Sequence, residues 1–313
     1  MEAQQETLTL LYPEDTIRRY FGRGADRHLA QFTRSIANAN DFLREHPREA
    51  LTAGKGRPDG LTRALQYYKD ETFLTLWAFI SLDLAAKPEH LKERERLCTQ
   101  LLRQALPNLG ITVTAPKLEL EKLVVPPKKY LEVLAQSFRD EPDSCHPVWY
   151  LRVLGAGNSS LEGNTHSDAF LTYNGDRHVL FEAKFLSDIS ASTTYGPERN
   201  QLTRNLDAGL ANAGFALERF AYVFITPQRF RDRPESRFYG YKLSEYMDAE
   251  KGPSALKRDL PHLERLVDYA DLAQHIGWVT WEEIVALLAA SPVFCSPEFP
   301  HAEVHDFFRE RCI

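Results

Sequence analysis

The middle of the chain alternates between strand-like runs and turn residues. Ser167–Tyr173 and His178–Phe185 are β-prone runs, and Asn174-Gly175-Asp176 separates them. An Asn-Gly pair between two such runs is a strong signal of a β-hairpin. Phe220–Thr226 is a third, mostly apolar run that stops at Pro227, and it predicts a buried strand.

Before this region, apolar residues recur at helical spacing. The helices expected there are Asp15–Tyr20, Asp26–Glu45, Leu61–Ala86 and His90–Ala105. Ile111–Val125 reads as a short strand or an extended connector, and Pro126-Pro127 follows it. Because a proline pair stops helices and stiffens linkers, we expect a domain boundary there. The prediction is a mostly helical region over residues 1–125 and a second domain over residues 126–313 with a helical C-terminal extension.

The second domain has a definite order of predicted elements. Helix Lys128–Arg139 and strand Val148–Leu154 precede the hairpin, and a helix near Gln201 and strand Phe220–Thr226 follow it. The expected fold class is therefore α/β, with an α-β-β-β-α-β core and a mixed sheet. The elements expected after this core are helix Leu256–His275, strand Gly277–Val279, helix Trp281–Ala290 with Thr280 and Glu283 as a capping box, and helix His301–Arg311.

Composition narrows the class of protein. The chain has 313 residues, of which 43% are apolar and 26% charged, as in ordinary globular domains. Its apolar runs are shorter than the roughly 20 residues of a membrane helix, and its acidic start lacks the basic region of a signal peptide. The four cysteines are scattered without a Cys-x-x-Cys pair, which indicates neither a zinc site nor a disulfide framework. We expect a cytoplasmic protein that is not bound to membranes.

Candidate chemistry lies on the predicted hairpin. Glu182 and Lys184 share one face of the second strand, and an antiparallel first strand brings Asp168 near their level. Two carboxylates suffice for Mg²⁺, which keeps several waters, and the carbonyl oxygen of Ala183 is a third hard ligand. Mn²⁺ is the expected substitute. Lys184 would lie beside the attacking water, either to position it or to accept its proton.

Asp168, Glu182-Ala183-Lys184 and the later Gln201-x-x-Arg204 together resemble the PD-(D/E)XK nuclease superfamily, whose fold is restriction-endonuclease-like. The resemblance covers roughly residues 128–226, and Ser167 stands where the family name has proline. It implies that Asp168 and Glu182 hold the metal, that Lys184 is the catalytic lysine, and that Gln201 and Arg204 reach the metal site or the scissile phosphate.

For some residues the sequence allows both a functional role and an ordinary structural role. Glu132 and Glu162 are both candidates for a fourth acid, and each can equally be an ordinary polar residue. His166 is a substrate contact or a strand-end histidine. Glu182 and Lys184 themselves can form a surface ion pair on an edge strand. Arginines suited to a basic groove are Arg199, Arg204, Arg229, Arg231 and Arg233, although a solvated basic turn explains the last three as well.

The expected function is Mg²⁺-dependent hydrolysis of phosphodiester bonds, most simply by an endonuclease acting on DNA, with RNA as a variant. The net charge of −6 is unusual for a nucleic-acid-binding protein, so a positive groove would have to be local. Cutting both strands requires two active sites, which implies a homodimer or a partner subunit. Restriction or anti-phage defence is the setting that the resemblance implies. The alternative is a non-catalytic module of the same fold that binds nucleic acid or a protein.

Overall fold

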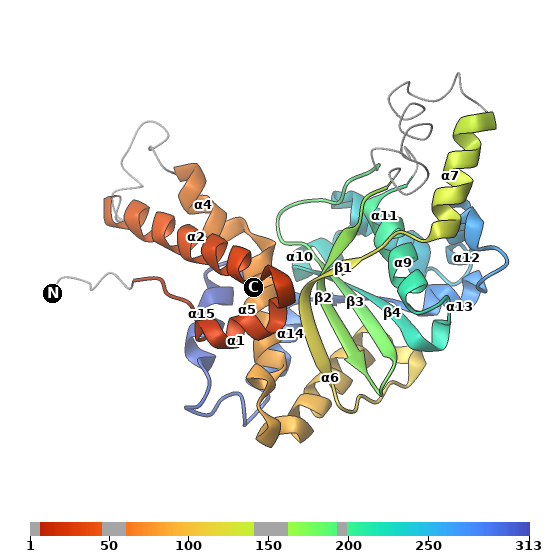
Figure 1. Ribbon diagram of the computed structural model, residues 1–313. Helices are drawn as coiled ribbons and strands as arrows, with labels where there is room; N and C mark the ends of the chain where they lie inside the picture. Colours follow the sequence, from red (N-terminus) through yellow and green to blue (C-terminus); the bar gives the residue numbers. More distant parts are fainter. Residues whose placement is uncertain (1–6, 46–60, 141–161, 193–198) are drawn as a thin grey trace.

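A five-stranded mixed sheet organises the chain in the computed structural model, which describes residues 7–45, 61–140, 162–192 and 199–313 (Figure 1). Its order is β1-β2-β3-β4-β5, formed by β1 (Lys117–Val124), β2 (Thr165–Tyr173), β3 (Arg177–Ala183), β4 (Phe220–Thr226) and β5 (Ile276–Thr280). The pairs β1–β2 and β2–β3 are antiparallel, whereas β3–β4 and β4–β5 are parallel. The α/β class with a mixed sheet is thus confirmed.

Helices cover both faces of the sheet, and strand residues alternate between them. One face packs against α1 (Glu14–Phe21), α2 (Ala25–Glu45), α5 (Glu71–Leu82), α6 (Leu91–Ala105), α14 (Trp281–Ala289) and α15 (His301–Arg309). The other packs against α9 (Gln201–Asn212), α11 (Phe238–Met247), α12 (Gly252–Asp259) and α13 (Tyr269–Gln274). Phe181 and Ala183 belong to the first core and Leu180 to the second, as period-two alternation requires.

The predicted hairpin is confirmed at its turn. Asn174 and Gly175 both have positive φ, 50° and 89°, which is the backbone that an Asn-Gly hairpin turn demands. The side-chain oxygen of Asn174 also accepts a hydrogen bond from the backbone N–H of Thr114, at 2.7 Å. The turn is therefore tied to the segment that leads into β1.

Some predicted helices are broken where the chain has a local stop. The expected helix Leu61–Ala86 is α4 (Leu61–Lys69) followed by α5, because the side chain of Asp70 caps the start of the second helix. The prediction of one continuous helix over Leu256–His275 is wrong. It is divided by Pro261 into α12 and α13, with the 3₁₀ turn η9 (Pro261–Leu263) between them. The capping box of Thr280 and Glu283 on α14 is confirmed.

The start of the predicted core differs from expectation. Strand Val148–Leu154 lies outside the described residues, and the neighbour of β2 opposite to β3 is β1, which precedes α7 (Lys128–Asp140). α7 packs against η9 at the outer side of the second layer. Residues 7–125 therefore supply an edge strand and most of one helical layer, and they share one core with the later part of the chain. The division at Pro126-Pro127 stays a prediction.

β5 approaches α6 very closely at Gly277. A Cβ atom at this position would lie 2.5 Å from the carbonyl oxygen of Ala105, a backbone atom that cannot move by a rotamer change. We expect Gly277→Ala to lower the free energy of unfolding by about 1–3 kcal/mol, the usual cost of overpacking. Chemical denaturation measures this, with Gly163→Ala as the control because that glycine faces open space. Equal losses in both variants would contradict the close packing.

Candidate active site

Three carboxylates lie in a row across adjacent strands. Leu120 pairs with Ala169 and Lys122 with Ser167, so Glu121 on β1 lies level with Asp168 on β2. Ala169 pairs with Phe181, and one residue further along this register Asp168 is opposite Glu182 on β3. We call Glu121, Asp168 and Glu182 the acid row.

The Glu182 carboxylate is buried and held by three donors. Its Oε1 accepts hydrogen bonds from Lys184 Nζ and Gln201 Nε2, each at 2.7 Å, and its Oε2 accepts one from Asn205 Nδ2 at 2.6 Å. The residue is 2% exposed. Burial raises the pKa of Glu182, and the ammonium of Lys184 opposes that rise. Gln201 and Asn205 are one turn apart on α9, so one helix face orients this carboxylate.

Asp168 is bound to the strand that carries Glu182. Its Oδ2 accepts a hydrogen bond from the backbone N–H of Ala183 at 2.6 Å. Burial and then the charge of Glu182 raise the pKa of Asp168 well above its ordinary value. Both effects follow from placing the half-buried Asp168 carboxylate beside the buried Glu182 carboxylate.

Lys184 is positively charged in this arrangement. Burial disfavours its ammonium, but the charges of Glu182, Asp168 and Glu71 outweigh burial and raise its pKa. A lysine with a raised pKa holds its proton, so the geometry favours a role as a fixed cation over a role as a general base.

Glu71, the first residue of α5, is a site residue absent from the sequence prediction. Its Oε1 accepts hydrogen bonds from the backbone N–H of Phe185, at 2.9 Å, and from the hydroxyl of Ser187. Its Oε2 lies 3.6 Å from Lys184 Nζ. The helix start is visible in the sequence as Asp70-Glu71 before an apolar run, but nothing local indicates a contact more than a hundred residues away.

Glu121 is the second residue that the sequence analysis missed. It has φ 50° and interrupts the ladder between β1 and β2. Burial, followed by the charges of Glu182 and Asp70, raises the pKa of Glu121 to about 7. The sequence has two alternating glutamates here, Glu119 and Glu121. Only the register of β1 against β2 shows which of them lies level with Asp168.

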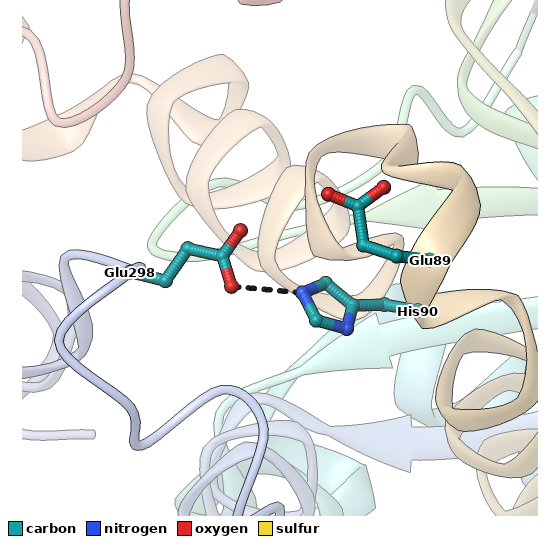
Figure 2. Close-up of side chains that lie close together, drawn as sticks. All are labelled: Glu89, His90 and Glu298. Atoms are coloured by element: carbon teal, nitrogen blue, oxygen red, sulfur yellow. Dashed lines mark hydrogen bonds and ion pairs between the residues drawn. The ribbon is translucent and has the colours of Figure 1, made fainter.

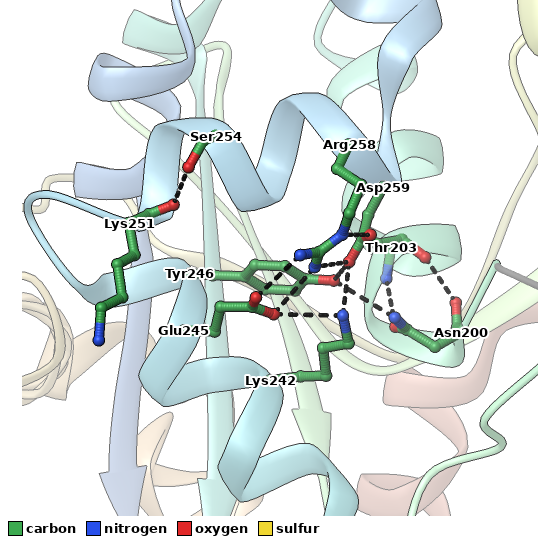
Figure 3. Close-up of polar contacts among 9 residues, drawn as sticks. All are labelled: Asn200, Thr203, Lys242, Glu245, Tyr246, Lys251, Ser254, Arg258 and Asp259. Atoms are coloured by element: carbon green, nitrogen blue, oxygen red, sulfur yellow. Dashed lines mark hydrogen bonds and ion pairs between the residues drawn. The ribbon is translucent and has the colours of Figure 1, made fainter.

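A polar network sets where α9 begins and hence where Gln201 lies. The side chain of Asn200 accepts a hydrogen bond from the Thr203 N–H and caps the helix. Asn200 Nδ2 in turn donates to the hydroxyl of Tyr246, which donates to Asp259 (Figure 3). Lys242 Nζ also binds Asp259, at 2.8 Å. The second helical layer thus fixes the helix end that meets Glu182.

The other residues expected at the site lie outside the acid row: Arg204, Glu162, Glu132 and His166. Arg204 Nη2 donates to the carbonyl oxygens of Gly163 and Asn164, at 2.8 and 3.0 Å, so it holds the loop before β2. Of the two candidates for a fourth acid, Glu162 is buried against Arg199 at 2.9 Å, and Glu132 is exposed on α7. His166 is exposed on β2.

Two of the expected groove arginines are unsuited to that role. Arg199 is 4% exposed and forms buried ion pairs with Glu162 and Asp207. Arg231 makes two hydrogen bonds of 2.8 Å to Glu283, which also caps α14. Arg229 and Arg233 are exposed.

The donor set of the acid row suits a hard divalent cation. The residues that would hold it are Asp168, Glu182 and the carbonyl of Ala183, all of them oxygen donors. Desolvation and then repulsion from Glu182 raise the pKa values of Glu121 and Asp168, and a cation would relieve that repulsion. Glu182 accepts two hydrogen bonds at Oε1 and one at Oε2, so Oε2 keeps an acceptor site that a cation could use.

A second group of possible ligands lies on other segments than the acid row. Within the described ranges, Glu89, His90 and Glu298 are the one set of acidic, histidine or cysteine ligands whose atoms lie within 4.8 Å of one another (Figure 2). Glu298 is already paired with His90, at 2.9 Å, and with the ammonium of Lys87. The ammonium of Lys87 competes with a metal ion for the Glu298 carboxylate. Ion pairing between two loops therefore explains this group of residues.

The raised pKa of Glu121 predicts how stability depends on pH. Between its ordinary value of 4.5 and about 7, Glu121 is protonated in the folded protein and ionised in the unfolded chain. Its contribution to the free energy of unfolding therefore falls as the pH rises through this window, by up to roughly 3 kcal/mol. Thermal unfolding in EDTA from pH 5 to 8 should show a shallower decline for Glu121→Gln than for the wild type. Parallel profiles would show that Glu121 does not titrate in this range.

Comparison with known proteins gives no independent information on this site. No family model, curated protein or solved structure matches the chain. None of the described helices combines the length and apolar character that crossing a membrane requires.

Proposed function

We propose that this protein is a divalent-cation-dependent nuclease that hydrolyses phosphodiester bonds, with DNA as the expected substrate. The observation that carries the proposal is the buried contact of Glu182 with Lys184, at 2.7 Å, level with Asp168 on the neighbouring strand. Burying two charges is expensive, and apolar residues of similar size usually stabilise a fold as well or better. A chemical role accounts for this arrangement better than a structural one.

The order of elements supports the same reading. Among the described elements, with α7 set aside, helix α6, strands β1, β2 and β3, helix α9 and strand β4 come in this order. The pairs β1–β2 and β2–β3 are antiparallel, and β4 is parallel to β3. This is the α-β-β-β-α-β order that the PD-(D/E)XK resemblance implies, with α6 and β1 in place of the helix and strand expected from the sequence. α7 is then an insertion between the first two strands.

Each residue has a definite task in the proposed reaction. A bound Mg²⁺ would stabilise the negative charge that develops on the phosphate. Asp168 and Glu182 would hold that ion. The ammonium of Lys184 adds a second fixed positive charge and orients the attacking water. Gln201 and Asn205 keep the Glu182 carboxylate in one orientation, as their hydrogen bonds show.

The alternative is a non-catalytic module that binds nucleic acid or a protein through the same fold. One observation favours it, namely that three of the roughly four acceptor sites of the Glu182 carboxylate are already taken by donors of the chain itself. Such a module would bind its partner with Asp168 and Glu182 replaced. Restriction or anti-phage defence remains the biological setting suggested by the family resemblance alone.

Cleavage assays test the proposal directly. Wild type, Asp168→Asn and Lys184→Ala are incubated with supercoiled plasmid, linear duplex, single-stranded DNA and RNA, each with Mg²⁺, Mn²⁺ or EDTA. We expect metal-dependent cleavage that drops by about 10³-fold in both variants, because several kcal/mol of charge stabilisation are lost. Asp176→Asn, at the hairpin end of the same strands, is the matched control and should cleave normally. A folded wild type inactive on every substrate would contradict the proposal.

Thermal shift locates the cation independently of activity. Mg²⁺ or Mn²⁺ should raise the melting temperature of the wild type and leave Asp168→Ala unchanged. Glu298→Gln removes a carboxylate from the group in Figure 2 and should keep the full shift. Loss of the shift in Glu298→Gln with retention in Asp168→Ala would move the cation to that second group.

A further inference from the structure

Two exposed arginines lie at opposite ends of the acid row. Arg27 belongs to the first turn of α2, and Arg229 belongs to α10 (Gln228–Arg231), the short helix directly after β4. The row itself runs from β1 to β3. The two side chains come from parts of the chain about two hundred residues apart.

α2 packs against α1, and α1 contacts β1, so Arg27 in the first turn of α2 lies on the β1 side of the row. Gln31 lies one turn further along the same helix face, and its Nε2 donates to Asp70 at 3.2 Å. Asp70 caps α5, whose first residue, Glu71, binds the backbone just after Lys184. The charge of Arg27 also counteracts the burial that raises the pKa of Glu121.

Aromatic contacts place Arg229 at the other end. Its guanidinium carbon lies 5.7 Å from the ring centre of Phe185, the residue after Lys184, and 5.1 Å from that of Phe230. Arg237 lies over the same Phe230 ring at 4.3 Å. Rings and guanidinium groups thus form a short stack beside the end of β3.

Neither Arg27 nor Arg229 takes part in an ion pair with the described residues, in contrast to Arg199 and Arg231. Arg27 Nη2 is 3.5 Å from His28 Nε2, and Arg229 Nη1 is 3.4 Å from the carbonyl oxygen of Cys312, both long contacts. Two exposed guanidinium groups beside a row of carboxylates are suited to bind anions that approach those carboxylates. Guanidinium groups bind phosphate well because their donors match its oxygens.

We propose that the phosphodiester backbone of a nucleic acid crosses the ends of β1 to β4, with one phosphate at Arg27, another at Arg229, and the acid row between them. The inference rests on the proposed function and adds the path of the substrate. Three strand spacings separate β1 from β4, at least about 14 Å. At roughly 3.4 Å of rise along the duplex axis per phosphate of one strand, that distance corresponds to about four phosphate-to-phosphate steps. The N-terminal helical region, through Arg27, is then part of the binding surface.

Fluorescence anisotropy tests the path without requiring cleavage. Labelled duplex DNA, single-stranded DNA and single-stranded RNA are titrated with protein in EDTA and in Ca²⁺, over a series of salt concentrations. We expect Arg27→Ala and Arg229→Ala each to weaken binding about fivefold at 0.1 M salt and to lower the salt slope by about one, the contribution of one phosphate contact. Arg27→Lys and Arg229→Lys should restore most of the affinity. The order of affinities identifies the type of nucleic acid.

Arg219→Ala is the matched control, because Arg219 is an exposed arginine that pairs with Asp176 at the hairpin end of the sheet. Wild-type affinity in this variant together with losses in the other two supports the path. Affinities unchanged in Arg27→Ala and Arg229→Ala, or no binding to any nucleic acid, would overturn it. Binding that depends on both arginines, from a protein that never cleaves, would uphold the path and reject the nuclease.

Discussion

The burial of the Glu182 carboxylate is the constraint on which the rest of the site depends. An ionised carboxylate away from water is tolerated only when it is paired and hydrogen-bonded. Here the compensation comes from Lys184, directly after the same strand, and from Gln201 and Asn205 on α9. The position of α9 over the sheet is therefore fixed by polar contacts as well as by apolar packing, and those contacts converge on one side chain.

The site is also a junction between early and late parts of the chain. Glu71 at the start of α5 holds the backbone at Phe185, and the indole of Trp281 donates to the carbonyl oxygen of Lys184 at 3.0 Å. The segment after β3 is thus clamped by residues from the N-terminal helices and from α14. Helices that the sequence predicts as a separate N-terminal region therefore hold the end of β3, the central strand of the sheet.

Local signals predicted much of the fold. The Asn-Gly turn, the apolar run of β4 and the Thr280 cap each depend on a few neighbouring residues, and each lies where the sequence placed it. The relation of Asp168 to Glu182 followed from the hairpin as well. Local patterns could not predict contacts between distant segments. Examples are the pairing of β1 with β2, the contact of Glu71 with Phe185 and Lys184, and the position of Glu121 level with Asp168. Arg204 shows the limit within one helix, because its spacing from Gln201 is helical but its guanidinium is drawn to the carbonyls of Gly163 and Asn164.

The N-terminal cap of α9 determines which face of this helix is turned toward Glu182. Successive residues of an α-helix are turned by about 100° about its axis, so the first residue determines which side chains face the sheet. Asn200 fixes that first residue, and Tyr246 and Asp259 fix Asn200. If α9 were shifted in register by one residue, a turn of about 100°, Gln201 and Asn205 would point away from Glu182 together. A tyrosine and an aspartate from the second helical layer thus determine the angular position of the donors around a carboxylate that neither of them touches.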